Sequence, residues 1–392
     1  MKYFLKILLG LCCMPFFLQA QPGVENERKW TLNGYIKQMQ TVNMIDGFDS
    51  LLVDNLIHNR LNFRWFPESD WEFRMDLRNR VFYGDLVQLI PNYGAFIDNN
   101  NDYFDLSALP LNRSKVVFHT MIDRAYLKWS HNKWEATVGR QRINWGINTA
   151  WNPNDIFNAY SFFDFDYEER PGSDAVRVVY YTGFASSLEI AANMADDIDN
   201  WVGAGRWKFN QWNYDFQLIG GLSRGDLVLG AGWAGNLGQA GFKGEMSYFT
   251  PFREEDIQEN VLVASTAFDY SFENSIYLYG SYLFNSGGEN NPSTEILGLA
   301  TLSNQRLNAK TLIPYRHTFF LQGMYPFHPL VNGGLALMYF PGDGAAFLNP
   351  TVTYSIGENW DLDLLGQLFY LDNKGGGNSN GKLFYLRLKW SF

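Results

Sequence analysis

Several arginines lie an even number of positions apart within segments that otherwise alternate with apolar residues. This spacing suggests contacts with ions or solutes. Near residue 75, Arg74, Arg78 and Arg80 share one face of an extended chain, because successive side chains alternate. Guanidinium groups bind anions and carboxylates, but they stay charged and do not act as acids or bases near neutral pH. We expect nine arginines to line a polar interior: Arg60, Arg64, Arg74, Arg78, Arg80, Arg124, Arg140, Arg142 and Arg177.

Acidic residues occupy the corresponding face of segments further along the chain. The acids expected to face the same interior are Asp215, Glu245, Asp269, Asp361 and Asp363. A basic wall opposite an acidic wall creates a transverse field, which orients dipolar solutes and sets ion preference. Glu72 and Asp76 interrupt the basic side, so the alternative is that the charges pair within the wall and hold it rigid. The sequence leaves both interpretations open.

Catalytic chemistry has little support in the sequence. The five histidines are scattered, and no motif joins any of them to a nucleophile. Asp361 and Asp363 suit a charged lining better than glycosidase chemistry. Neither a phosphate-binding glycine loop nor a cluster of metal ligands stands out in the sequence. We therefore expect no enzyme activity, no cofactor and no metal site.

One compact motif lies between residues 138 and 155. It reads Val-Gly-Arg-Gln-Arg-Ile-Asn-Trp-Gly from 138 to 146, and Trp-Asn-Pro-Asn-Asp from 151 to 155. The pattern resembles porin-like outer-membrane families related to alginate-export barrels, in which a Gly-Arg-Gln strand leads into a Trp-Gly turn and an Asn-Pro-x-Asp loop. The matching residues are Gly139, Arg140, Gln141, Trp145, Gly146, Asn152, Pro153 and Asp155. The resemblance implies a monomeric porin or polymer-export pore, and it does not carry over the alginate substrate.

The connection 145–172 that begins in this motif is long and rich in aromatic residues. Exposure of this many aromatic side chains to water is unfavourable. We therefore expect the loop to fold inward and narrow a pore. Packing on the rim of a barrel is the alternative. The residues expected to form the constricting loop are Trp145, Trp151, Asn152, Asp155, Phe162 and Phe163.

Period-two alternation along the chain predicts the elements that hold these side chains. In the final segment one face is apolar, with Phe384, Leu386, Leu388, Trp390 and Phe392, and the other is polar, with Tyr385, Arg387, Lys389 and Ser391. The segment near residue 75 places Phe73, Met75, Leu77 and Val81 opposite its charges, and that after Trp360 places leucines opposite Asp361, Asp363 and Gln367. One face suits lipid and the other suits water, which is typical of a transmembrane β-barrel.

Short turns flanked by aromatic residues divide the alternating segments. They occur at 66–71, 129–134, 209–212, 272–277 and 325–329 and are expected in the periplasm, whereas the longer connections 85–116, 145–172, 251–259, 286–314 and 372–381 are expected outside the cell. The alternating turns predict an all-β, up-and-down antiparallel barrel of eighteen strands, with sixteen as the alternative count. An even number places both termini in the periplasm.

The first residues indicate export. Lys2 and Lys6 precede an apolar run over 7–18, and Ala20 offers a small residue for cleavage. We expect a signal peptide at 1–20, a short periplasmic segment at 21–29 and a single barrel over 30–392. No later run approaches the ~18 apolar residues of a membrane-spanning helix. The expected location is the outer membrane of a Gram-negative cell.

Composition supports this class. Aromatic residues make up 17% of the 392 residues, charged residues make up 18%, and the formal net charge is −10. A barrel places many aromatics in belts at the lipid boundaries, and an acidic chain is a poor partner for nucleic acid. A soluble β-rich protein with a large aromatic core or sugar-binding face is the alternative.

Together these features predict a channel for passive diffusion of small polar or anionic solutes, saccharides among them. The alternative is a barrel with a closed lumen that binds surface polysaccharide or a partner protein. The expected partners are outer-membrane lipid and small polar solutes, and the expected state is a monomer. A final strand that ends on Phe392 resembles outer-membrane barrels generally, where a terminal aromatic is part of the signal to the barrel-assembly machinery.

Overall fold

A computed structural model describes residues 29–392, apart from 46–50, 99–101, 160–165, 167–168, 196, 198, 253–258, 291–307, 343 and 374–376. The expected signal peptide, 1–20, lies outside the described residues, as does the expected periplasmic segment, 21–29, except for Lys29. Among the described residues, no helix combines the length and the apolar character needed to cross a membrane.

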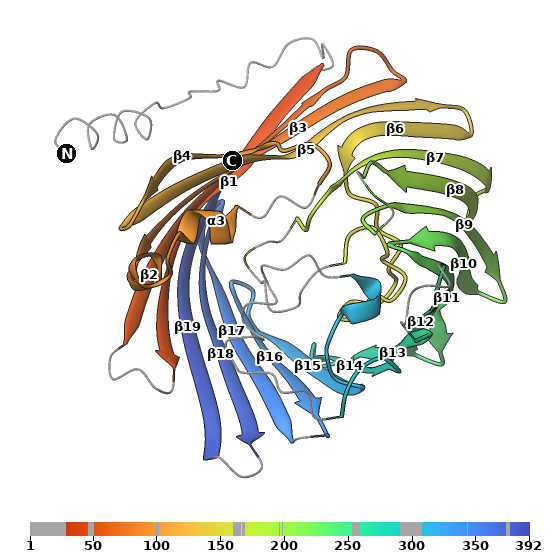
Figure 1. The fold of residues 1–392 in the computed structure, drawn as a ribbon. Helices are drawn as coiled ribbons and strands as arrows, with labels where there is room; N and C mark the ends of the chain where they lie inside the picture. Colours follow the sequence, from red (N-terminus) through yellow and green to blue (C-terminus); the bar gives the residue numbers. More distant parts are fainter. Residues whose placement is uncertain are drawn as a thin grey trace.

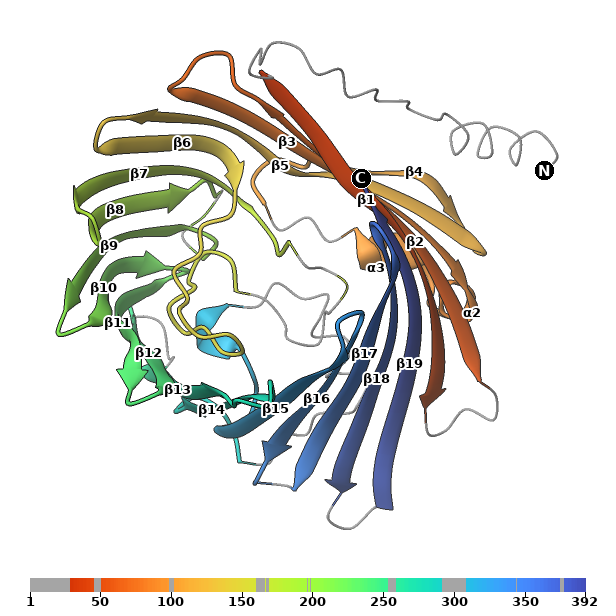
Figure 2. The same cartoon turned by 180° about the vertical axis from the view of Figure 1, so that it is seen from behind.

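The chain forms a closed, transmembrane, antiparallel β-barrel (Figures 1 and 2). The wall strands are β1 (Trp30–Ile45), β2 (Leu52–Trp65), β3 (Trp71–Gly84), β5 (Val116–His131), β6 (Trp134–Gln141), β7 (Ser173–Gly183), β8 (Ser186–Asn193), β9 (Val202–Gln211), β10 (Tyr214–Ser223), β11 (Asp226–Leu237), β12 (Ala240–Pro251), β13 (Val261–Ser271), β14 (Tyr277–Asn285), β15 (His317–His328), β16 (Val331–Phe340), β17 (Ala345–Gly357), β18 (Trp360–Asn373) and β19 (Gly377–Ser391). Successive wall strands pair, and β19 pairs back to β1. The predicted eighteen-strand barrel is confirmed.

The connection 85–116 contains more regular structure than the predicted loop. It holds α2 (Asp85–Leu89), α3 (Tyr93–Ile97) and an extra strand, β4 (Ser107–Arg113). Strand β6 pairs with β5 between Ala125 and His131, and β4 pairs with β5 between Val116 and Met121. The extra strand therefore supplies hydrogen-bond partners to the part of β5 that extends beyond the end of β6, which explains why a segment predicted as a loop forms a strand.

Burial alternates along the wall strands as the sequence predicts. On β19, Phe384, Leu386 and Trp390 are exposed, whereas the residues between them are half-buried. On β3, Asp76 and Arg78 are buried while the outward Met75 is exposed. The outer surface is therefore mainly apolar and the inner surface mainly polar in these strands, as a barrel in lipid requires.

Short turns gather at one end of the barrel. All five aromatic-flanked turns predicted from the sequence join consecutive wall strands, and the turn at 66–71, for example, connects β2 to β3. Trp30 pairs with Trp65 beside this turn, and Ser391 pairs with Tyr35, so the two ends of the barrel sequence lie at the same end as the turns. The predicted position of both barrel ends beside the short turns is thus confirmed.

Closure between the first and last strands depends on a glycine. Gly34 and Phe392 exchange backbone hydrogen bonds of 2.9 and 3.0 Å. A Cβ at Gly34 would lie 2.1 Å from the carbonyl oxygen of Arg60 and 3.1 Å from the Phe392 ring. Since no side chain fits there, glycine allows the backbone of β1 to lie close to its two neighbours.

The predicted loop 372–381 was too long. Strand β18 extends to Asn373 and β19 begins at Gly377, with Asp372 opposite Asn378. Polar and glycine-rich residues suggested a loop in the sequence, but strand pairing continues through them because the ladder hydrogen bonds involve only the backbone.

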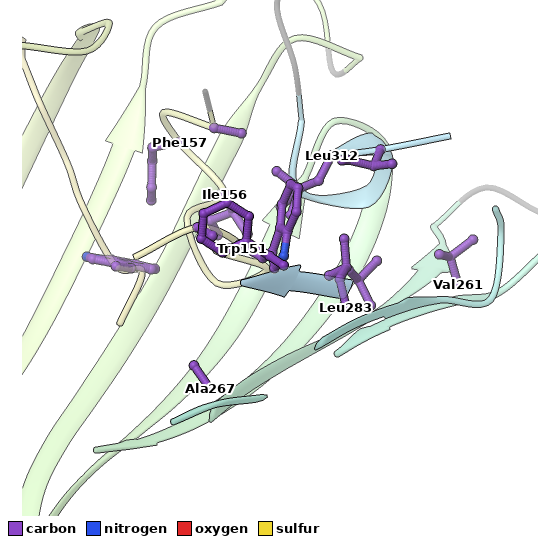
Figure 3. Close-up of a cluster of buried hydrophobic side chains, with 14 of the residues drawn as sticks. Trp151, Ile156, Phe157, Val261, Ala267, Leu283 and Leu312 are labelled. Atoms are coloured by element: carbon purple, nitrogen blue, oxygen red, sulfur yellow. The ribbon is translucent and has the colours of Figure 1, made fainter. Parts of the chain in front are cut away.

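The hydrophobic core lies inside the barrel. It joins the inner faces of strands from β7 to β18 to two connections that fold inward, one after β6 and the other containing the short helix η2 (Ala309–Thr311). Figure 3 shows Trp151, Ile156 and Phe157 of the first connection beside Leu283 of β14 and Leu312 of the second. The wall and these two connections thus pack as one unit.

Candidate functional site

The connection 142–172 between β6 and β7, here called the lumen loop, lies inside the barrel (Figure 1). Its described residues are 142–159, 166 and 169–172. Trp145, Trp151, Asn152 and Asp155 are all buried. Phe162 and Phe163 lie outside the described residues.

The lumen loop starts from a twist at the end of β6. Gly139 has a φ of 118°, and the next residue, Arg140, is buried. The Arg140 guanidinium donates to both carboxylate oxygens of Asp174, at 2.9 and 2.8 Å. Strict alternation would turn Arg140 toward lipid, but further partners on the connection 85–116 shield its guanidinium, since it also donates to the Phe104 carbonyl and lies 3.7 Å from Asp102. The described register of β6 is continuous with both neighbours, so the twist occurs without a bulge.

Glu245 of β12 anchors the first part of the lumen loop. Its buried carboxylate accepts hydrogen bonds from the backbone N–H groups of Ile147, Asn148 and Asn154, at 2.9, 2.7 and 3.0 Å. The sequence predicted that Glu245 points inward. In the structure it satisfies three loop donors, which is a stronger constraint than a single neutral hydrogen bond.

Side chains of the lumen loop make further polar contacts with the same wall. Asn154 donates to the carbonyl of Ala231 at 2.9 Å and accepts from Ser247 at 2.7 Å. Asn148 donates to Ser265 at 2.6 Å. These contacts engage both sides of the Asn154 amide and the amide nitrogen of Asn148, so this half of the loop has a defined conformation.

Aromatic packing strengthens this attachment. The rings of Trp145 and Phe157 meet edge to face at 5.1 Å, and Trp151 meets Phe320 of β15 at 6.4 Å. The Trp145 indole N–H donates to Glu189 of β8 at 2.8 Å. The sequence predicted these tryptophans as part of an inward loop, and they fix that loop to the wall.

The returning part of the lumen loop contacts the opposite wall. Asp166 lies 2.8 Å from the Lys37 ammonium on β1 and 2.9 Å from His58 on β2. Burial alone would raise the pKa of Asp166, but Lys37 and His58 outweigh it and hold this pKa well below 3.8. The carboxylate therefore remains charged and paired at neutral pH.

Glu169 and Arg170 extend the contact with that wall. Tyr35 donates to the Glu169 carboxylate at 3.2 Å, and the Arg60 guanidinium lies 3.6 Å from it. Arg124 donates to the backbone carbonyls of Glu169 and Arg170 at 3.0 and 2.5 Å. The first part of the lumen loop and its described returning part are thus fixed on opposite walls of the barrel.

Asp155 lies at the buried centre of the first part of the loop. Burial raises its pKa to about 6, against the opposing effects of the charges on Arg142 and Arg170. The motif predicted a loop residue at this position. Because of its raised pKa, the ionised form of the Asp155 carboxyl is only weakly favoured at neutral pH.

The arginines of the predicted basic wall have partners. Arg60 contacts Asp76 at 2.9 Å and Asp123 at 2.6 Å, and Arg74 contacts Asp76 at 2.7 Å. Arg78 contacts His58, Arg80 contacts His119, Arg177 contacts Glu135 and Glu189, and Arg64 contacts Glu72. This wall is therefore a network of ion pairs and arginine–histidine hydrogen bonds rather than a row of free cations.

The predicted acids are also engaged. Asp363 contacts Arg387 at 2.8 Å, Asp269 contacts Lys243 at 3.2 Å, and the hydroxyl of Ser355 donates to Asp361 at 2.8 Å. Asp215 accepts from Asn210 at 2.8 Å and is exposed near the short-turn end. The structure brings Asp363 close to the basic wall, because β18 is only two strands from β1.

Several important residues were missed from the sequence. Asp123, Glu135, Glu189 and Arg206 all form inward ion pairs. Glu189 lies between the outward Leu188 and Ile190, so the alternation could have revealed its direction. Asp123 and Arg124 are both buried because the register shifts between β3 and β5 at this point, and simple alternation does not reveal such a shift.

The second inward connection is fixed separately. The Lys310 ammonium lies 2.9 Å from Asp226 of β11, and Tyr315 stacks on Phe340 of β16 at 4.2 Å. Within the described part of the chain, no group of three or more potential ligand side chains is placed to hold a metal ion. The described interior of the barrel thus contains paired charges and two inward connections that are attached to the wall.

Solved structures with the same fold cover nearly the whole chain. Acinetobacter baumannii OccAB4 is 9% identical, with 93% of this chain and 98% of that chain covered and a TM-score of 0.58. Pseudomonas aeruginosa OccK5 (OpdH) is 10% identical, with coverages of 93% and 98% and a TM-score of 0.57. The outer membrane protein opdK of Pseudomonas aeruginosa is 11% identical, with coverages of 92% and 98% and a TM-score of 0.55.

No protein-family model matches the chain, and no curated protein matches its sequence. The chain has the fold of outer-membrane porins.

Proposed function

We propose that the protein is an outer-membrane channel for passive diffusion of small polar solutes. One observation carries this proposal: the lumen loop reaches both walls of the barrel, with Glu245 holding one part and Lys37 the other. A loop held in this way narrows a barrel lumen without filling it as a separate plug would. The fold likeness to outer-membrane porins supports the same function.

The outer membrane of a Gram-negative bacterium is the proposed location. Exposed apolar side chains cover the outer face of the strands, and tryptophans such as Trp65, Trp71 and Trp134 lie near the short turns. Such a belt is typical of outer-membrane barrels. Export through a signal peptide at 1–20 is part of the proposal, as is assembly through the final strand that ends at Phe392.

The proposed solutes are small and polar, saccharides among them. Anionic solutes are included because Arg64, Arg74 and Arg177 keep partly exposed side chains inside the barrel. Since each of these groups also has a carboxylate partner, the basic wall attracts anions less strongly than free arginines would. The expected anion preference stays a prediction.

The relationship to alginate-export barrels is a finer proposal that rests on the motif. Arg140 and Gln141 end β6, and Trp145, Asn152 and Asp155 form the buried part of the lumen loop. The motif therefore coincides with the end of β6 and the first part of the lumen loop. Alginate itself is not part of the proposal.

The second candidate is a barrel with a closed lumen that binds a surface polysaccharide or a protein. The inward packing of a second connection, through Lys310 and Tyr315, favours it, because two such connections leave less room for a passage. Recordings in a planar bilayer decide between the two functions. Stepwise conductance from the purified protein is expected for the channel, whereas a correctly folded but silent barrel would favour the closed-lumen function.

A further inference from the structure

Charges of alternating sign line the inner face of six neighbouring wall strands. This charge ladder consists of Glu72 on β3, Lys128 on β5, Glu135 on β6, Arg177 on β7, Glu189 on β8 and Arg206 on β9. These three acids and three bases carry no net charge together, and Arg64 of β2, 3.9 Å from Glu72, continues the alternation. It lies beside the lumen loop, because Trp145 donates its indole N–H to Glu189.

Successive members of the charge ladder are in contact. Lys128 lies 2.8 Å from Glu135, and the other oxygen of Glu135 lies 2.9 Å from Arg177. Glu189 bridges Arg177 and Arg206, with distances of 2.6 Å on both sides. Glu72 pairs directly with Lys128 in the register of β3 and β5. Each inner member therefore has neighbours of opposite charge on both sides.

Four members of the charge ladder are partly accessible to water, with exposed side-chain fractions of 21% for Glu72, 31% for Lys128, 12% for Glu135 and 24% for Arg177. The last two members are more buried, at 1% for Glu189 and 11% for Arg206. By contrast, Arg60 on the basic wall is 0% exposed. Strands ~4.8 Å apart and tilted by ~35–45° incline the ladder to the barrel axis, so it advances roughly 15 Å along the lumen.

We propose that the charge ladder is a track for small zwitterionic solutes that carry one ammonium and one carboxylate group. This inference rests on the proposed channel function and names a solute class for it. An anion near Arg177 is attracted by that side chain and repelled by Glu135 and Glu189, and for a cation the signs are reversed. A zwitterion instead meets one neighbour of each sign, and it replaces a pair within the ladder by two new pairs without leaving a charge unpaired.

Four solutes of nearly equal size test the proposal in liposomes that contain the purified full-length barrel. Glycylglycine is zwitterionic, N-acetylglycinate is anionic, glycylglycinamide is cationic and N-acetylglycinamide is neutral. Osmotic swelling should be several-fold faster with glycylglycine than with the neutral compound, because the ladder raises the local concentration of the zwitterion. Equal rates for the two compounds in a barrel that conducts KCl would overturn the ladder proposal and leave the channel function intact. A barrel silent to KCl and to all four solutes would overturn both.

A double variant separates alternation from net charge. Glu135→Arg combined with Arg177→Glu keeps the total charge but places like charges side by side in the ladder. The advantage of glycylglycine should be lost while the KCl conductance is retained. Asp70→Asn changes a charge in a turn, where the Asp70 carboxylate lies 2.8 Å from the exposed His131, and should keep the advantage. If the double variant keeps the advantage, the proposal is wrong.

A single variant covers the case in which the double variant does not fold. Glu135→Gln leaves Lys128 and Arg177 without their shared partner, so uptake of N-acetylglycinate should rise relative to glycylglycine. Heat-dependent gel mobility verifies that each barrel is folded. A folded Glu135→Gln barrel with an unchanged ratio would contradict the proposal.

Discussion

At the scale of single residues, one carboxylate has the largest role in holding the lumen loop. Glu245 accepts three backbone N–H groups of that loop from a fully buried position. Such a carboxylate combines the function of three acceptors, so its loss would leave three buried donors without this acceptor.

Replacing Glu245 with Ala should therefore loosen the lumen loop. Three buried N–H groups lose their acceptor, which weakens docking of the loop by roughly 2–5 kcal/mol. We expect more frequent conductance fluctuations in single-channel recordings and faster proteolysis within 145–170. Glu245→Gln is the matched control, because it keeps one acceptor oxygen and should have a smaller effect. Equal behaviour of the Ala variant and the unmodified protein would show that the loop is held elsewhere.

Asp155 makes docking of the loop depend on pH. Burial raises its pKa to about 6 from an ordinary value of 3.8, so the docked loop binds a proton more tightly than a released loop. Docking is therefore strongest below pH 3.8 and weakens as the pH rises through about 6, by about 3 kcal/mol in total. Proteolysis within 145–170 should be slower at pH 4.5 than at pH 7.

The control for this pH effect is Asp155→Asn, which should reduce the difference between pH 4.5 and pH 7. Asp166 contributes no opposite slope in this range, because its pKa lies well below 3.8 and it stays charged. A proteolysis rate that is independent of pH in the unmodified protein would contradict this account of Asp155.

At the scale of elements, the end of β6 shows how a charged side chain is kept out of lipid. Gly139 has a φ of 118° just before Arg140, and the buried Arg140 guanidinium pairs with Asp174 and donates to the Phe104 carbonyl. An arginine exposed to lipid at the bilayer midplane would cost ~2–4 kcal/mol, so these partners remove a large penalty.

Gly139→Val should destabilise the barrel measurably. The added Cβ would lie 2.3 Å from the carbonyl oxygen of Ala125, and a β-branched residue at a φ of 118° is strained by about 1–3 kcal/mol or more. We expect a lower urea midpoint of unfolding. Gly357→Ala is the control, since nothing lies within 4 Å of a Cβ at that position and its midpoint should hardly change. Equal midpoints for both variants would disprove the role of Gly139.

The sequence predicts the elements better than their long-range contacts. Alternation in β3 and β19 reveals inward and outward faces because it depends only on neighbouring residues. The contact between Lys37 and Asp166 joins residues 129 positions apart and depends on the path of the lumen loop. Periodicity contains no information about that path, so the ion pairs between the lumen loop and the wall were not predictable. Pairing within the basic wall, as between Arg60 and Asp76, was one of the two interpretations that the sequence left open.

At the scale of the whole molecule, the barrel closes through its first and last strands. Gly34 and Phe392 exchange two backbone hydrogen bonds at this seam. Their mutual pairing means that the last residue of the chain takes part in closure, in addition to the assembly signal proposed for it.

Removing Phe392 should slow closure of the barrel. The deletion removes the backbone partner of Gly34 and an aromatic ring packed near β1. We expect a lower rate of appearance of the heat-resistant folded band during insertion into lipid vesicles. Phe392→Tyr keeps the backbone and an aromatic ring and serves as the control. If the deletion folds as fast as the unmodified chain, the terminal residue has no part in closure.

The most direct test of the channel proposal is the single-channel conductance of a barrel in which residues 145–170 are replaced by a short Gly–Ser linker. The wall strands keep their pairing, because the replaced segment lies entirely between β6 and β7. If the lumen loop narrows the passage, conductance should rise several-fold in a barrel that remains folded by heat-dependent gel mobility. An unchanged conductance in a folded variant would contradict the account, since the constriction would then lie outside this loop.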